Sequence, residues 1–145
     1  IISSSARALY ALRILRSHGM KEIDIQNVFR ATVLSKLVYA SPSWWGFTNN
    51  SHRERLECFL RKATKAGFYP KESKTFSEIC EDADQVFFRR VINNDDHPLK
   101  LFLPPKLSRS YNMRSRIHDF QLPDKKNSYY DNNFFIRIFY ARDQE

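Results

Sequence analysis

Apolar residues recur at steps of three and four along the first half of the chain, which is the spacing that gives a helix one buried face. A first helix is predicted over residues 6–18, a run rich in the strong helix formers Ala, Leu and Arg, with Gly19 as its terminator. A second helix is predicted from Asp24, as its N-cap, to Ser41-Pro42, because proline supplies no N–H and disfavours helical backbone in the residue before it.

The third predicted helix opens at residues 49–51 and stops at Gly67. Beyond it the periodic signal weakens. Two short helices are predicted over residues 75–80 and 83–92, and a final apolar helix over 134–140 follows a pair of asparagines that can cap it.

This order of elements predicts an all-α fold class. We expect a basic three-helix bundle over residues 1–69, a linker over 70–76, and short helices with irregular chain over 77–145. The boundary is placed at the linker because Pro70 lies there and because the charge balance of the chain changes there. Since the sequence starts with Ile1 rather than Met, we interpret it as a segment of a longer polypeptide.

Charge is unevenly distributed along the chain. Residues 1–75 contain 13 Lys and Arg against 5 Asp and Glu, a balance of +8, whereas residues 76–145 contain 11 of each. This asymmetry indicates a polyanionic partner for the first half. No apolar run reaches the roughly 20 residues that span a bilayer. A membrane surface is the lesser alternative to nucleic acid as the partner, because the basic residues are shared among several elements and do not lie on one amphipathic helix. Cys58 and Cys80 have no close spacing and are interpreted as reduced thiols of an intracellular protein, cytoplasmic or nuclear.

The basic faces of the first and third predicted helices are the candidate nucleic-acid site. Lysine and arginine bind nucleic-acid backbones by displacing condensed counterions, and this requires only several cations on one connected surface. The alternative is an ordinary solvated helix surface, in which Glu54 and Glu57 pair with Arg61 and its neighbours. The candidate nucleic-acid-binding residues are Arg13, Arg16, Arg53, Arg55, Arg61, Lys62 and Lys65.

Two other clusters have simpler structural explanations. Trp44, Trp45 and Phe47 could stack on unpaired bases, but such a cluster is more typical of a turn packed against a core. Asp95-Asp96 resembles the metal-binding aspartates of polymerases, yet the surrounding Asn-Asn-Asp-Asp-His-Pro sequence is typical of a turn.

Metal and phosphate motifs are weak elsewhere. A zinc site would need Cys58, Cys80, His97 and His118 to converge from distant segments, without the close ligand pairs that zinc sites usually show. No catalytic residue and no metal ligand is therefore assigned. The polar cluster over residues 114–120 could contact phosphate or form local ion pairs, and the sequence leaves both open.

Three segments together resemble one family, the reverse transcriptases of non-LTR (LINE-type, jockey-like) retrotransposons. Residues 3–19 are similar to the segment just after the palm of these enzymes. Residues 32–47, and the stretch from Arg55-Leu56-Glu57 to Gly67-Phe68-Tyr69-Pro70, are similar to sequence a little further on. The looser matches to the family's C-terminal region are residues 97–99, 103–105, 114–123 and 133–137.

The resemblance implies a thumb-like helical bundle and a short C-terminal region of an RNA-directed DNA polymerase that copies element RNA into DNA at a nicked target. The family's catalytic aspartates, in a Phe/Tyr-x-Asp-Asp motif, belong to the palm upstream of this segment. The chain by itself is therefore not expected to be an enzyme or to hold a cofactor, and a divalent metal is expected only in the palm. The implied partners are RNA, an RNA–DNA duplex and the palm in cis. The cysteine- and histidine-rich knuckle of some relatives does not occur here.

Three alternatives remain at the level of the sequence. The chain could be a structural module that docks on the rest of the polymerase without contacting nucleic acid. It could be an independent metal-dependent nuclease that uses Asp95 and Asp96, or a degenerate genomic copy without a function. Binding that ignores salt would favour the first, and divalent-metal activity lost in Asp95→Asn would favour the second.

Overall fold

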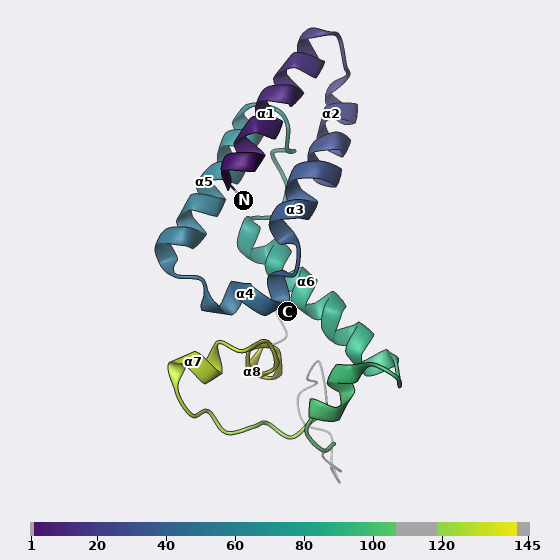
Figure 1. Ribbon diagram of the computed structural model, residues 1–145, viewed down its shortest axis with the longest axis vertical. Helices are drawn as coiled ribbons and strands as arrows, with labels where there is room; N and C mark the ends of the chain where they lie inside the picture. Colours follow the sequence, from purple (N-terminus) through teal and green to yellow (C-terminus); the bar gives the residue numbers. More distant parts are fainter. Residues whose placement is uncertain (1, 107–118, 142–145) are drawn as a thin grey trace. The chain divides into compact units, whose positions relative to one another are not determined.

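The computed structural model describes residues 2–106 and 119–141, and its regular elements are helical (Figure 1). No strand forms among these residues, although an isolated antiparallel bridge joins Lys106 to Phe120. The expected all-α class is confirmed. Across the described ranges, no helix combines the length and apolar character that a bilayer crossing requires.

The described chain contains both longer α-helices and short helical segments of three to five residues. The first half contains α1 (Ile2–Ser17), α2 (Glu22–Phe29), the π-helical η1 (Arg30–Leu34), α3 (Ser35–Val38), α4 (Ser41–Trp44), the 3₁₀ turn η2 (Trp45–Phe47) and α5 (Asn50–Lys65). The second half contains α6 (Phe76–Asn93), the 3₁₀ turn η3 (Pro98–Phe102), α7 (Ser128–Asp131) and α8 (Phe134–Tyr140).

Contacts group the described residues into two compact units. Unit 1 takes its residues from 1–41 and 48–83, and unit 2 takes its residues from 42–47 and 84–145. The predicted linker over residues 70–76 lies inside unit 1. Helix α6 contributes its first half to unit 1 and its second half to unit 2.

Unit 1 is built around α1, which lies alongside both α2 and α5 (Figure 1). Its core is aromatic and aliphatic, and the rings of Phe29 and Tyr69 meet at 5.9 Å. The most deeply buried apolar side chains of the unit are Ile25, Phe29, Val33, Ala63, Phe68, Phe76 and Cys80.

The helix ends in unit 1 follow the glycine signals of the sequence. Gly19 and Gly67 have positive φ angles of 89° and 73°, the left-handed conformation that ends a helix. After α5 the N–H of Gly67 donates to the carbonyl of Thr64, and the N–H of Phe68 donates to that of Ala63. The same pair of bonds closes α1, so both ends form Schellman motifs.

The second predicted helix differs from the structure at both ends. Helix α2 begins at Glu22, two residues before the predicted cap, so Asp24 lies in its first turn and the prediction of an Asp24 N-cap is wrong. Position 24 still suits a carboxylate, because the first turn carries the positive end of the helix dipole. At the far end α3 stops at Val38, and Ser41-Pro42 begins α4. Proline is tolerated there because the first turn has no intrahelical partner for an N–H.

Helix α6 is continuous where two short helices were predicted. One reason is that its start is strongly capped. Thr75 and Glu78 form a capping box, in which the N–H of Thr75 donates to the Glu78 carboxylate at 2.7 Å and the N–H of Glu78 donates to the Thr75 hydroxyl at 3.3 Å. A second reason is that one face of the helix is buried along its whole length. Phe76 and Cys80 are buried before the polar stretch that separates the two predicted helices, and Phe88 and Val91 are buried after it.

Unit 2 is held together by a phenylalanine-rich cluster and a buried ion pair. Its core residues are Phe88, Phe120, Phe134, Ile138 and Phe139. Arg137 pairs with the buried Asp84 at 2.9 Å, and it also donates to the carbonyl of Pro42 at 3.2 Å. Helix α8 confirms the predicted final helix, and the side chain of Asn133 caps it by accepting from the N–H of Phe135.

The aromatic segment before α5 is partly core, as the sequence suggested. Trp45 is buried and Trp44 is half-buried, with their rings edge to face at 5.9 Å. Phe47 is exposed and lies 5.0 Å from the ring of Tyr129. The core-packing interpretation is therefore confirmed for Trp45 and not for Phe47.

Candidate nucleic-acid interface

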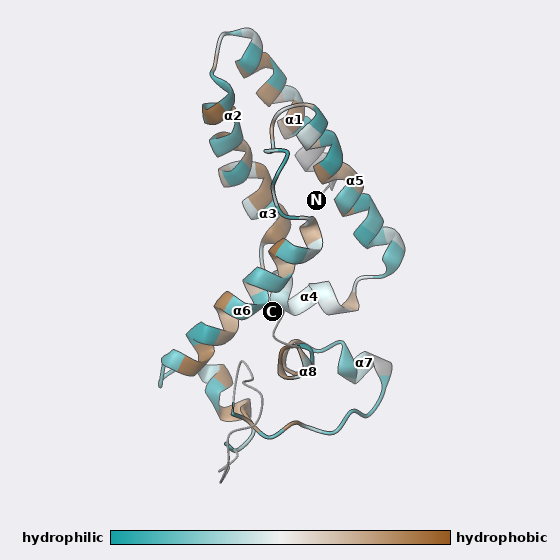
Figure 2. Cartoon of the chain, turned by 180° about the vertical axis from the view of Figure 1, so that it is seen from behind, coloured by the Kyte–Doolittle hydropathy of each residue, from teal (hydrophilic) through white to brown (hydrophobic). Residues whose placement is uncertain are grey.

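Helix α5 presents most of the candidate cations. The side chain of Asn49 caps its start by accepting from the N–H of His52 at 2.8 Å, as the sequence predicts. Its apolar residues are buried, and the rest of its surface is hydrophilic, which Figure 2 shows in teal. The buried residues of α5 are Leu56, Phe59, Leu60 and Ala63.

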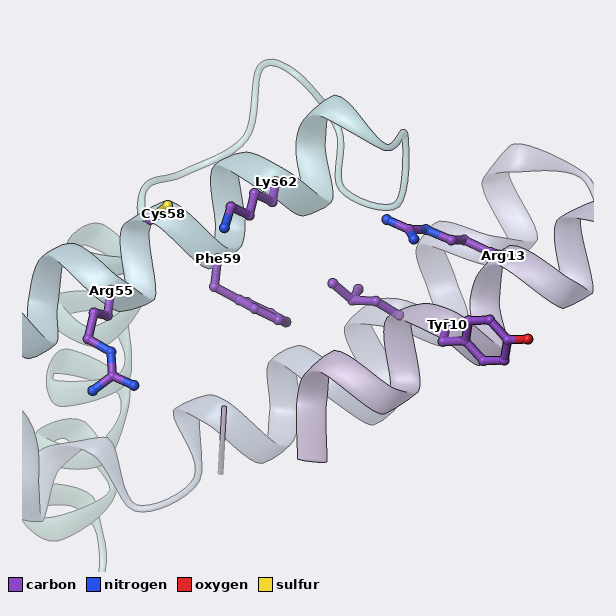
Figure 3. A pocket seen from close by; sticks show the side chains of 7 residues that line it. Tyr10, Arg13, Arg55, Cys58, Phe59 and Lys62 are labelled. Atoms are coloured by element: carbon purple, nitrogen blue, oxygen red, sulfur yellow. The ribbon is translucent and has the colours of Figure 1, made fainter. Parts of the chain in front are cut away.

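A groove lies between α1 and α5 within unit 1 (Figure 3). Its volume is about 470 Å³. It brings together three of the seven candidate residues, Arg13 from α1 with Arg55 and Lys62 from α5. The other lining residues are Leu9, Tyr10, Cys58 and Phe59, so the described lining contains no carboxylate.

The lining residues divide into an apolar interior and an exposed rim. Phe59 is buried and points from α5 into the space between the helices, and Arg13 reaches toward the same space from α1 (Figure 3). Tyr10 stands at the edge with 65% of its surface exposed. Arg13, Arg55 and Lys62 are all exposed. The groove therefore combines three cations in contact with solvent and an apolar interior.

The remaining candidates do not line the groove. Arg16 lies over the ring of Phe68, with its guanidinium carbon 4.6 Å from the ring centroid, in a cation–π contact. Arg53 is half-buried, and Lys65 is exposed in the last turn of α5. These three side chains therefore lie on the same two helices but outside the lining of the groove.

Arg61 is held by an acidic neighbour. Its guanidinium pairs with Glu54 at 2.5 Å, seven residues earlier on α5, and this hydrogen bond raises the pKa of Arg61. Both side chains remain more than half exposed, at 59% and 67%. Glu57, in contrast, accepts from the N–H groups of Phe76 and Ser77 at the start of α6. Glu57 and Glu54 were predicted as i,i+4 partners of Arg61 and its neighbours. Glu54 does pair with Arg61, but at a spacing of seven residues, and the prediction is wrong for Glu57.

The paired aspartates that the sequence offered as a metal site have a structural role. Asp95-Asp96 lies in an exposed turn, where the N–H of Asp96 donates to the Asn94 side chain and Asp95 pairs with Lys100. The pairing lowers the pKa of Asp95. The turn interpretation of this sequence is confirmed.

No metal site is evident in the described part of the chain. Within residues 2–106 and 119–141, no group of three or more His, Cys, Asp or Glu side chains could hold a metal ion. Cys58 is half-buried beside the groove and Cys80 is buried in the core of unit 1, both as thiols. His118 and most of the polar cluster over residues 114–120 lie outside the described residues.

Sequence reasoning found the cations of the groove but not its interior. Leu9, Tyr10 and Cys58 were not proposed as site residues, although a signal for them exists. They lie three or four positions from the cations on the same helices, the spacing that puts side chains on one face. That the two faces meet depends on the packing of α1 against α5.

No protein-family model, no curated protein and no solved structure matches this chain.

Proposed function

We propose that this chain is a region downstream of the palm of an RNA-directed DNA polymerase of the non-LTR retrotransposon type. Its α1–α5 face holds the backbone of RNA or of an RNA–DNA duplex. In this proposal unit 1 is the thumb-like bundle, in place of the predicted residues 1–69, and unit 2 is the C-terminal region. The observation that supports the proposal is the groove that Arg13, Arg55 and Lys62 line, with no carboxylate among its described lining residues.

Backbone binding follows from the chemistry of these three side chains. Each exposed cation can neutralise a phosphate and release a condensed counterion, which favours binding by the entropy of the released ion. Arg16 and Lys65 are further exposed cations, each one turn beyond a lining cation on α1 or α5. Phosphate contacts position a nucleic acid without reading its sequence, so this face is expected to bind without sequence preference.

The proposal is tested by the salt dependence of binding. Fluorescence anisotropy would measure the affinity of the chain for a labelled RNA–DNA duplex between about 50 and 200 mM salt. The key variant is Arg13→Ala/Arg55→Ala/Lys62→Ala. Because each phosphate contact contributes a slope of about 0.9 in log affinity against log salt, the variant should lower the slope by roughly 2.7.

A charge-matched control distinguishes the effect of cations in the groove from the effect of the total charge of the chain. Lys21→Ala/Arg30→Ala/Lys71→Ala removes three exposed cations of unit 1 that do not line the groove. Both variants lower the net charge from +8 to +5. The control should change the slope by less than about 1, the contribution of a single contact. If the two variants lower the salt slope equally, binding depends on net charge and not on the groove. If the affinity does not change with salt, the alternative of a structural docking module is favoured.

Sequence preference provides a second check. Arg55→Ala should weaken binding by the same factor on duplexes of different sequence, because a phosphate contact carries no base information. A changed preference among duplexes would show that Arg55 reads bases, which contradicts the proposed mechanism.

A further inference from the structure

We infer that unit 2 carries a nucleic-acid surface of its own, an exposed strip of aromatic and lysine side chains on which an unpaired strand stacks its bases. This surface lies outside the α1–α5 groove, so the inference goes beyond the proposed function and does not depend on it. Two of its helices, α7 and α8, contact each other (Figure 1). The strip consists of Phe47 from η2, Tyr129 and Tyr130 from α7, Tyr140 from α8, and Lys125 and Lys126 from the segment before α7.

The first support is the accessible ring of Tyr129. This residue is 76% exposed, and the ring of Phe47, itself exposed, lies 5.0 Å from its ring at a tilt of 44°. A ring that is covered on both faces could not keep so much of its surface exposed, so a face of Tyr129 is open to solvent. Base–aromatic stacking needs such a face and tolerates any base, because every base has a π-face.

The second support is the pair of lysines beside the rings. The ammonium group of Lys125 lies 4.3 Å from the ring centroid of Tyr140, and that of Lys126 lies 5.5 Å from the centroid of Tyr130. Both lysines are exposed, so their ammonium groups keep N–H donors for a phosphate. Because Tyr130 follows Tyr129 directly on α7, the lysine beside Tyr130 is one residue away from the open ring. The strip therefore combines cations for the backbone with rings for the bases, as single-strand sites do.

The composition of the strip favours nucleic acid over a protein or a membrane. Protein interfaces are enriched in aromatic residues but depleted of lysine. A helix that lies on a membrane buries a broad apolar face, whereas α7 has four residues. Asp124 and Asp131 flank the lysines in the sequence, so the strip adds little net charge and stacking supplies most of its affinity. Bases inside a duplex are stacked on their neighbours, so an unpaired strand is the ligand that uses the open ring.

The test compares strands that differ only in their bases. Anisotropy at about 200 mM salt, which weakens phosphate contacts, would measure the affinity of the full chain for a single-stranded RNA oligonucleotide and for an abasic strand with the same number of phosphates. Tyr129→Ala should weaken binding of the strand with bases about 10-fold and leave binding of the abasic strand unchanged. Tyr129→Phe should bind like the original chain, because stacking needs the ring and not the hydroxyl. Tyr39→Ala, which removes an exposed tyrosine of unit 1, is the control and should also bind like the original chain.

Photocrosslinking locates the bound strand independently. A single strand that contains bromouracil would be irradiated with the full chain, and the modified residues would be identified by mass spectrometry. We expect adducts on Tyr129 or on Phe47, whose rings lie side by side. Near-ultraviolet circular dichroism of each variant would verify that unit 2 keeps its packing.

The outcomes separate this inference from the proposed function. If Tyr129→Ala binds the strand with bases as tightly as the original chain, or if all adducts lie in unit 1, the inference is overturned. The groove would still be supported by a lower salt slope in the Arg13→Ala/Arg55→Ala/Lys62→Ala variant. An unchanged slope in that variant, together with the loss in Tyr129→Ala, would overturn the groove and support the strip. Binding of the folded chain to vesicles of phosphatidylserine and phosphatidylcholine, without binding to either strand, would overturn the inference in favour of a membrane surface.

Discussion

Gly46 shows at the scale of one residue how closely unit 2 is packed. A Cβ atom at this position would overlap the backbone oxygen of Asn132 and would lie 2.6 Å from the Nε atom of Arg137. Arg137 cannot move freely, because it pairs with Asp84 and donates to the carbonyl of Pro42. Glycine is required here by the close approach of the chain and not by a positive φ angle.

Gly46→Ala should therefore destabilise unit 2. The added methyl group must displace backbone as well as the Arg137 side chain, and forced overpacking of this kind typically costs about 1–3 kcal/mol. Urea denaturation followed by circular dichroism would measure the change in unfolding free energy. Ser43→Ala, at an exposed position nearby, is the control and should unfold like the original chain. An unchanged midpoint in Gly46→Ala would contradict the packing at this site.

At the same scale, two asparagine caps were predictable from the sequence, whereas the predicted Asp24 cap was wrong. Asn49 and Asn133 cap α5 and α8 as expected, because their side chains accept from N–H groups two or three residues away. Glu57 was not predictable in this way. Its carboxylate accepts from the backbone N–H groups of Phe76 and Ser77, which lie 19 and 20 residues further along the chain. No local sequence pattern predicts that contact.

At the scale of the element, the start of α6 is capped by the carboxylate of Glu78, and the cap favours its ionised form. The backbone N–H and the hydroxyl of Thr75 both donate to Glu78, and these bonds lower the pKa of Glu78 below its ordinary value of 4.5. Because the pKa of Glu78 is lower in the folded chain than in the unfolded chain, its ionisation stabilises the folded chain at pH values above the unfolded-state pKa. The stabilisation is lost as the pH falls through the folded pKa.

Glu78→Gln should therefore make stability less sensitive to acid. Glutamine preserves the hydrogen bonds of the capping box but does not titrate, so it removes this one contribution to the pH dependence. Between about pH 7 and about pH 3, the urea midpoint of the original chain should fall further than that of the variant. If the two chains lose the same stability between these pH values, Glu78 does not contribute as proposed.

At the scale of the whole molecule, the two compact units are not two successive stretches of sequence. Residues 42–47 belong to unit 2 although they lie between two stretches of unit 1. The contacts that tie this segment into unit 2 are made by Gly46 and Pro42 with Arg137. Unit 2 is therefore assembled from segments about 40 residues apart or more.

This arrangement predicts an asymmetry between two fragments of the chain. Residues 1–83 include all of unit 1 and should retain a cooperative thermal transition. Residues 84–145 lack the 42–47 segment, so Arg137 loses an acceptor and a packing partner. We expect this fragment to lose fixed tertiary structure, measured as loss of the near-ultraviolet circular dichroism of its aromatic residues. Cooperative unfolding of residues 84–145 alone would contradict the discontinuous unit.

The sequence by itself determined the helical class, several helix ends and the charge of the candidate site. Apolar spacing, asparagine caps and the glycines at positions 19 and 67 act within about four residues, so they can be read without knowing the fold. The location of Arg13, Arg55 and Lys62 on basic helix faces was predictable for the same reason.

Only the tertiary structure decided which of these cations share a groove, which helix Glu57 caps and which unit residues 42–47 join. It also separated Arg16 and Arg61, which lie against Phe68 and Glu54, from the cations of the groove. The physical reason is distance along the chain. Each of these outcomes depends on side chains that packing brings together across many residues, whereas sequence periodicity reports only the faces that each helix has available.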